Sequence, residues 1–204
     1  MKFSYENRLW KKGVQYVAGV DEVGRGPLAG PIVAAAVILS RASKIRGLAD
    51  SKLLTPRKRE ELCRRIRKEA LGIGIGIVGH RRIDRINIGR ANLLAMKRAV
   101  ERLRIAPDFI LIDGARNRID LPVAQKGICG GDRKCASIAA ASIVAKVTRD
   151  RIMRRYHGRY PEYRFDLHKG YGTRVHLQKL QEFGPCLIHR RSFRPVSALA
   201  QKPT

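Results

Sequence analysis

Acidic residues are scarce in this chain of 204 residues, where 17 Asp and Glu stand against 43 Lys and Arg. The formal net charge of +26 favours a polyanionic partner, and nucleic acid is the first choice. With so few acids available, a carboxylate at the end of an apolar segment needs a physical reason such as pairing or metal binding.

Long hydrophobic runs are also missing. The longest, residues 32–39, has the length of a strand and falls well short of the roughly 20 residues of a membrane span. The N-terminal residues have no apolar core of a signal peptide, so we expect a cytoplasmic protein without a membrane partner. Paired C-x-x-C spacing is absent, which argues against a zinc ribbon or disulfide framework and favours reduced thiols at Cys63, Cys129, Cys135 and Cys186.

The apolar pattern predicts an α/β domain. Strands are expected at 16–20, 32–39, 71–77, 109–112 and 121–124, and helices at 56–70, 83–103, 137–156 and 175–183. In the segment 71–77 isoleucine alternates with glycine, which indicates close packing on its glycine face. We therefore expect one domain over residues 1–196 with a central mixed sheet flanked by helices. A helical C-terminal part should begin at about residue 150, and residues 197–204 should form a disordered tail.

Four carboxylates occupy conspicuous positions. Asp21 and Glu22 follow an apolar strand, Asp113 follows another, and Asp150 lies on the helix predicted at 137–156. Oxygen ligands of this kind suit Mg²⁺ or Mn²⁺, and a pair of such ions can promote phosphodiester hydrolysis. Neighbouring side chains on a regular strand point to opposite faces, so Asp21 and Glu22 should share a site only where the strand ends and twists. Taken alone, an Asp-Glu dipeptide is usually surface decoration.

Glycine and aromatic residues point to a nucleic-acid contact. Gly24-Arg25-Gly26 allows backbone to approach a sugar-phosphate chain, although a tight turn with a solvated arginine would have the same sequence. Tyr171 lies between glycines in a loop-like segment and could stack on a base or sugar, or pack beneath its loop. Arginines around Asp150 and in the segment 189–194 are interpreted as a phosphate-facing surface, namely Arg149, Arg151, Arg154, Arg155, Arg190, Arg191 and Arg194. The five histidines show no ligand spacing.

With these residues in place, the chain resembles the type 2 ribonucleases H of bacteria, the ribonuclease HII family, from about residue 16 to about residue 196. The motifs that carry the resemblance are Asp21-Glu22-Val23-Gly24-Arg25-Gly26-Pro27-Leu28-Ala29-Gly30-Pro31, Asp50-Ser51-Lys52, Ile83-Asp84-Arg85-Ile86-Asn87-Ile88, Ile112-Asp113-Gly114, Lys146-Val147-Thr148-Arg149-Asp150, the Tyr171 loop and residues 189–193. The resemblance implies a ribonuclease H-like fold with a helical C-terminal extension. It also implies cleavage of the RNA strand of RNA–DNA hybrids and cleavage 5′ of single ribonucleotides in duplex DNA, by two-metal-ion hydrolysis that leaves 3′-hydroxyl and 5′-phosphate ends.

Roles follow from the resemblance position by position. Asp21, Glu22, Asp113 and Asp150 would be the catalytic, metal-binding carboxylates, with Mg²⁺ or Mn²⁺ as the cofactor. Gly24, Arg25 and Gly26 would read the ribose 2′-hydroxyl, Tyr171 would pack on the neighbouring sugar, and Lys52 would contact the phosphate backbone. We expect a monomer. Two other readings stay open: a basic nucleic-acid-binding protein without catalysis, and a transposase-like nuclease on the same type of fold.

Overall fold

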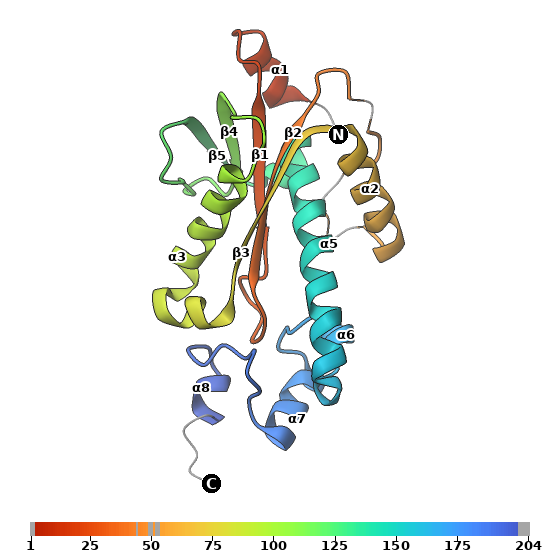
Figure 1. Cartoon of the computed structure of the whole chain (residues 1–204), viewed down its shortest axis with the longest axis vertical. Coiled ribbons are helices and arrows are strands. Elements are labelled where there is room, and N and C mark those ends of the chain that lie inside the picture. The colour runs from red at the N-terminus through yellow and green to blue at the C-terminus, as the bar shows by residue number, and fades with distance from the viewer. Residues whose placement is uncertain (1–2, 44, 49–50, 52–53, 200–204) are drawn as a thin grey trace.

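The computed structural model describes residues 3–43, 45–48, 51 and 54–199, and it contains one five-stranded mixed sheet of order β3-β2-β1-β4-β5 (Figure 1). β1 pairs antiparallel with β2 and parallel with β4. β2 and β3 are antiparallel, whereas β4 and β5 are parallel. The expected α/β fold class with a central mixed sheet is therefore confirmed.

The strands are β1 (Val17–Val23), β2 (Ile32–Leu39), β3 (Ala70–Val78), β4 (Phe109–Asp113) and β5 (Ala124–Ile128). The helices are α1 (Ser4–Trp10), α2 (Pro56–Glu69), α3 (His80–Glu101), α4 (Gly131–Lys134), α5 (Ala136–Arg159), α6 (Phe165–His168), α7 (Arg174–Phe183) and α8 (Val196–Leu199), with a 3₁₀ turn at Pro161–Tyr163.

Helices α3 and α5 cover opposite faces of the sheet, and glycines allow both to approach closely (Figure 1). A Cβ on Gly19 of β1 would lie 2.1 Å from the Ser137 backbone of α5. A Cβ on Gly74 or Gly76 of β3 would lie 1.9 Å from a carbonyl oxygen of α3. The glycine face of β3 is thus packed against a helix, as its sequence predicts.

Several element bounds differ from those predicted. β1 continues through Asp21 and Glu22 to Val23, because both residues pair regularly with β2. The edge strand lies at 124–128 rather than 121–124, in parallel register with β4. α3 begins at His80 and contains a break at Asn87, where φ is 64°. Within the tail that we expected to be disordered, residues 197–199 belong to α8, and residues 200–204 lie outside the described residues.

The C-terminal part packs around the far end of α5, beyond the sheet (Figure 1). Its chain contacts the loop between β1 and β2 through an isolated bridge between Ala29 and His189. At the opposite end, Glu6 of α1 accepts hydrogen bonds from the backbone and hydroxyl of Ser137, at 2.8 and 2.7 Å. A carboxylate at this helix N-terminus is stabilising, so α1 fixes the start of the helix that carries Asp150.

Candidate active site

Asp21 and Asp113 lie side by side at the ends of two parallel strands. The last paired residues of β1 and β4 are Val20 and Ile112, and the next residue along each strand is a carboxylate. Alternation along the strands places both side chains on the α5 face, the face on which Val17 and Leu111 contact Ile138. Asp113 is held there because its Oδ1 accepts a hydrogen bond from the Gly131 backbone at 2.6 Å.

The environment of Asp21 is costly for a negative charge. The residue is 5% exposed, and burial, followed by the charges of Glu22 and Asp113, raises the pKa of Asp21 well above its ordinary value. A hydrogen bond with Ser142 and one from the Glu22 backbone, at 2.7 Å, act in the opposite direction. An arrangement of this kind favours either a proton or a cation beside the carboxylate.

Glu22 projects from the opposite face of β1. The strand stays regular through this position, so the twist that we expected to bring Asp21 and Glu22 onto one face is not found. Glu22 Oε1 lies 3.7 Å from the Arg25 guanidinium. In the part of the chain that the structure describes, no three His, Cys, Asp or Glu side chains converge closely enough to hold an ion by themselves.

Asp150 stands apart from the other three carboxylates. It is eight residues along α5 from Ser142, which corresponds to about 12 Å of helix. Its Oδ1 accepts a hydrogen bond from Lys146 at 2.8 Å, and its Oδ2 lies 3.6 Å from Arg59. Arg59 also donates to the carbonyl oxygens of Ser51 and Leu54, so the pair of Asp150 and Arg59 is linked to the backbone at these two residues.

The Gly24-Arg25-Gly26 turn and Tyr171 lie next to each other. An ideal Cβ on Gly26 would meet only the Tyr171 ring, at 4.0 Å, and both residues are exposed. Gly24 has a φ of +98° and is buried, and its ideal Cβ would lie 2.4 Å from Arg149 Nε. The first glycine is therefore required by the turn, whereas the second leaves open space beside an exposed aromatic ring.

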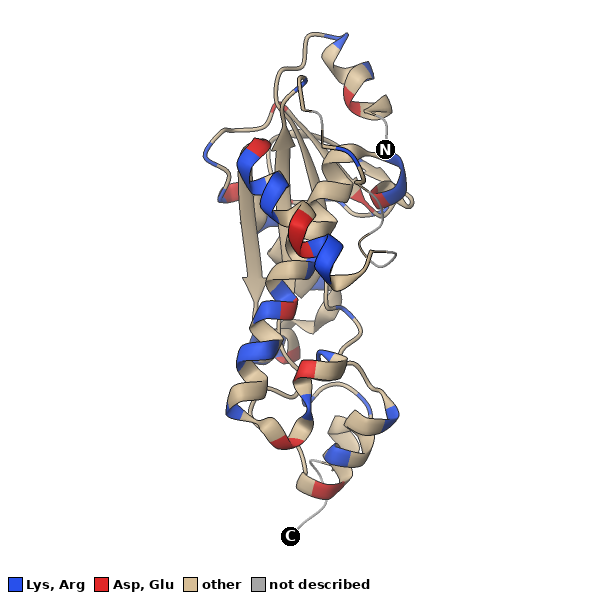
Figure 2. Ribbon diagram, turned by 90° about the vertical axis from the view of Figure 1, so that its right-hand side faces the viewer, with Lys and Arg blue, Asp and Glu red and all other residues tan. Residues whose placement is uncertain are grey.

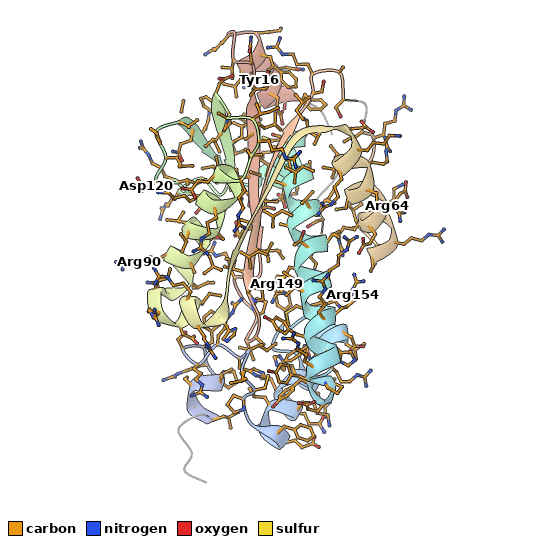
Figure 3. All side chains as sticks on the ribbon, in the orientation of Figure 1. Tyr16, Arg64, Arg90, Asp120, Arg149 and Arg154 are labelled. Carbon is orange, nitrogen blue, oxygen red and sulfur yellow. The ribbon has the colours of Figure 1, made fainter. Side chains whose placement is uncertain are left out.

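Two arginines that we interpreted as phosphate-facing are buried instead. Arg149 donates to the carbonyl oxygens of Ala29, Pro31 and Lys169, at 3.1, 2.9 and 2.9 Å. Arg190 donates to the carbonyl oxygens of Gly24, Arg25 and Gly30, at 2.6, 2.9 and 3.0 Å. These guanidinium groups fix the glycine turn from inside, because a planar group with several donors can satisfy several buried carbonyls at once. Figure 3 places Arg149 on the inner side of α5, unlike Arg154.

A cationic groove of about 570 Å³ extends from Asp150 between α2 and α5. Glu60 joins the two helices through ion pairs to Arg151 and Arg154, at 2.5 and 3.2 Å. The remaining basic residues of the groove are Arg57, Arg64 and Lys169. Figure 2 shows Lys and Arg along this side of α2 and α5, and Figure 3 shows Arg64 and Arg154 projecting outward. Lys52, expected to contact phosphate, lies outside the described residues.

The model of the family Ribonuclease HII matches residues 18–196. The chain belongs to this family. It is therefore a ribonuclease H, an endonuclease that acts on RNA–DNA hybrids, and the expected family and enzyme class are confirmed. Ribonucleases H depend on divalent metal ions.

The chain is 51% identical over 191 residues to ribonuclease HII of Caldicellulosiruptor saccharolyticus, covering 94% of this chain and 93% of that protein. Its identity to ribonuclease HII of Bacillus licheniformis is 52% over 195 residues, covering 96% and 76%. The crystal structure of ribonuclease H2 from Pyrococcus horikoshii superposes with a TM-score of 0.78 at 27% identity, covering 90% and 96%. That of Bst ribonuclease HIII in complex with Mn²⁺ gives 0.74 at 18% identity, covering 92% and 70%, and thus shares the fold.

The buried polar framework of this enzyme is not predicted by its sequence. The roles of Arg149 and Arg190 carry no local signal, because the carbonyl groups they bind are far away in the chain. The histidines His168, His176 and His189 show no ligand spacing, yet they lie together under the Tyr171 loop. In the described part of the chain, no helix is long and apolar enough to cross a membrane.

Proposed function

We propose that this enzyme cleaves the RNA strand of hybrids, and also cleaves 5′ of a single ribonucleotide in duplex DNA, leaving 3′-hydroxyl and 5′-phosphate ends. The observation that carries the proposal is that a pair of carboxylates and a sugar-sized contact surface lie at the same end of β1. The carboxylates Asp21 and Asp113 lie near the ends of the neighbouring strands β1 and β4, and the exposed Gly26 turn with the Tyr171 ring follows β1. We also propose that it works as a cytoplasmic monomer.

Asp21 and Asp113, which lie on one face of the sheet, would hold a divalent cation, Mg²⁺ or Mn²⁺, and Glu22, which lies on the other face of β1, would complete the set where the strand ends. The donor set fits, because Mg²⁺ is commonly bound through one or two carboxylates and completes its shell with water and substrate phosphate. A closed protein cage is therefore not required, and the raised pKa of Asp21 reflects a site short of positive charge. Such an ion, when bound, stabilises negative charge on the reacting phosphate and activates water.

Asp150 would complete the catalytic set from α5. Its present partners, Lys146 and Arg59, hold its two carboxylate oxygens beside the groove. Lys52 would bind phosphate, and the support for this is that Arg59 donates to the carbonyl oxygens of Ser51 and Leu54, which brings the described residues before and after it to Asp150.

Gly24, Arg25 and Gly26 would recognise the ribose. A 2′-hydroxyl both donates and accepts hydrogen bonds, and it distinguishes RNA from DNA at a given nucleotide. Gly26 presents backbone without a side chain, and the Tyr171 ring beside it offers a surface for the adjoining sugar. Arg25 is 55% exposed at its side chain and can pair with a phosphate.

The cationic groove, which extends from Asp150 between α2 and α5, would bind the duplex. Arg57 and Arg64 are exposed, and they lie seven residues apart on α2, which places them about two turns apart on one side of the helix. Contacts of this kind supply affinity without sequence preference. Hybrid and ribonucleotide-containing duplexes would therefore dock on the same surface.

The test compares three duplexes of identical sequence: all DNA, DNA with one ribonucleotide, and an RNA–DNA hybrid. We expect cleavage of the second and third in Mg²⁺ or Mn²⁺, none of the first, and none of any in excess chelator. Binding without cleavage in every metal would favour the non-catalytic alternative. Cleavage of the all-DNA duplex would favour a transposase-like nuclease.

A further inference from the structure

The turn and the loop proposed to contact the sugar are bonded to each other and to a third segment, residues 186–190. Leu28 donates its backbone N–H to the carbonyl of Gly170 at 2.8 Å, and Arg190 donates its own to the carbonyl of Leu28 at 2.8 Å. The side chain of Arg190 then holds the glycine turn. The position of Tyr171 relative to Gly26 therefore depends on contacts from this segment.

Two buried histidines connect the same segment to Tyr171 directly. His189 Nδ1 lies 3.0 Å from the Cys186 backbone nitrogen, and its Nε2 lies 3.0 Å from His176 Nε2. His176 Nδ1 lies 2.9 Å from the Tyr171 carbonyl oxygen. Both imidazoles are almost inaccessible to solvent, with 0 and 1% of their surface exposed.

The backbone groups at the two ends fix the direction of every bond. The Cys186 N–H can only donate, so His189 accepts at Nδ1 and carries its proton at Nε2. The Tyr171 carbonyl can only accept, so His176 carries its proton at Nδ1 and accepts from His189 at Nε2. One pair of neutral tautomers satisfies all three hydrogen bonds, from Cys186 through the two rings to Tyr171. A different tautomer of either ring would break two bonds.

The surroundings keep both rings neutral. Burial first, and then neighbouring histidines, lower the pKa of His176 to about 4 and that of His189 to about 3. Phe165 packs against both rings, and His168 stacks on His176 at 4.4 Å between ring centres. His168 is itself fixed, because its Nδ1 accepts from the Gly170 backbone at 3.2 Å.

We propose that His176 is a positioning residue for substrate recognition, which acts by holding the backbone of Tyr171 and is itself oriented by His189. The inference rests on the proposed role of Tyr171 at the sugar. The Tyr171 carbonyl also accepts from the Thr173 N–H at 2.8 Å. Loss of the imidazole therefore leaves that carbonyl paired, but it removes the partner of the His189 Nε2–H, so the effect on position must be measured apart from the effect on stability.

Two isosteric amides separate the roles of the ring nitrogens. In His176→Asn the amide occupies the place of Nδ1 and retains a donor to the Tyr171 carbonyl. In His176→Gln it reaches the place of Nε2, so the pairing with His189 is retained and the bond to Tyr171 is lost. The readout is the ratio of kcat/KM for the one-ribonucleotide duplex to kcat/KM for the hybrid. A general loss of stability does not move this ratio, and Ile66→Val, a buried change on α2, serves as the destabilised control.

We expect Tyr171→Ala and His176→Gln each to lower the ratio, the latter about fivefold, a size typical of residues coupled in one network. His176→Asn and Ile66→Val should stay within about twofold of the wild-type ratio. On a Tyr171→Ala background the two amides should become equal. Equal ratios for Asn and Gln in the presence of Tyr171, or a Gln defect that persists without Tyr171, would overturn the inference. A wild-type ratio in Tyr171→Ala would overturn the proposed role of Tyr171 itself, and with it the reason for positioning.

Discussion

The two glycines of the recognition turn should respond in opposite ways to the same added methyl group. In Gly24→Ala the new Cβ meets Arg149 Nε at 2.4 Å and the Pro31 carbonyl oxygen at 2.9 Å, in a backbone conformation with φ of +98°. Left-handed strain costs about 1–3 kcal/mol, and a displaced Arg149 leaves buried carbonyl groups unpaired at about 1–3 kcal/mol each. We expect a loss of about 3–5 kcal/mol in the free energy of unfolding, which corresponds to a Tm lower by roughly 10 °C.

Gly26→Ala should leave the fold intact and impair catalysis. Its φ lies outside the left-handed region, and the nearest atom to the new Cβ is in the Tyr171 ring at 4.0 Å. We expect a Tm within about 2 °C of wild type. The methyl group would occupy the space proposed for the ribose, and displacement of a substrate by about 1 Å typically costs about a hundredfold in rate, or about 2.7 kcal/mol.

The assay combines thermal unfolding with kcat/KM and Kd on a DNA duplex that contains one ribonucleotide. Binding of the duplex should be nearly unchanged in Gly26→Ala, because the cationic groove supplies it. Wild-type cleavage by Gly26→Ala would refute the assignment of this turn to the sugar. A drop in Tm as large as that of Gly24→Ala would refute the reading that its methyl group meets only open space.

Three further predictions concern charge. Asp113→Asn should stay folded, because its amide oxygen can still accept from Gly131, but should lose cleavage with the anionic ligand; near wild-type turnover in Mg²⁺ by the folded variant would contradict the role of Asp113 as a ligand. If the wild type neutralises about six phosphates, a plot of log K against log salt should have a slope near −5. The double variant Arg57→Ala, Arg64→Ala should reduce the magnitude of this slope by about 1.8. An unchanged slope would show that these two residues do not contact the duplex. Because the pKa of Asp21 is raised in the folded state, the stability it contributes is present below its unfolded pKa and is lost as pH rises through its folded pKa. In chelator, Asp21→Asn should therefore unfold at a higher Tm than wild type above the folded pKa of Asp21, and the difference should shrink as pH falls through that pKa; a difference that stays constant across the titration would contradict the raised pKa.

Local patterns in the sequence were sufficient for the elements and for the chemical identity of the site. Alternation of isoleucine with glycine in β3 predicted a strand with a helix packed on its glycine face, and α3 lies there at the distance that only glycine permits. Thr55 followed by Pro56 predicted the start of α2, and the Thr55 hydroxyl accepts from the Lys58 backbone at 3.3 Å. Signals of this kind depend on neighbours within a few residues, so they survive without knowledge of the fold.

Strand bounds near the site were harder to predict. The sequence predicts that the first strand ends before Asp21 and Glu22, because charged residues are rare inside a buried strand. Pairing with Ala35 and Ala34 of β2 extends β1 through both positions, and regular alternation then places the two carboxylates on opposite faces. The pairing partner decides this, and it lies more than ten residues further along the chain.

By itself the sequence determined that this protein is a basic α/β ribonuclease HII with carboxylates at strand ends and a glycine turn beside them. Only the tertiary structure decided which charged groups face the substrate and which hold the fold. Arg149 and Arg190 are as basic in sequence as Arg57 and Arg64, yet the first two are buried among carbonyl groups and the others line an open groove. His176 acquires its role only because His189 and Tyr171 come within hydrogen-bonding distance of it. The reason is physical: the energy of a charge or a hydrogen bond depends on its partners and its exposure to water, and folding brings those partners from distant parts of the chain.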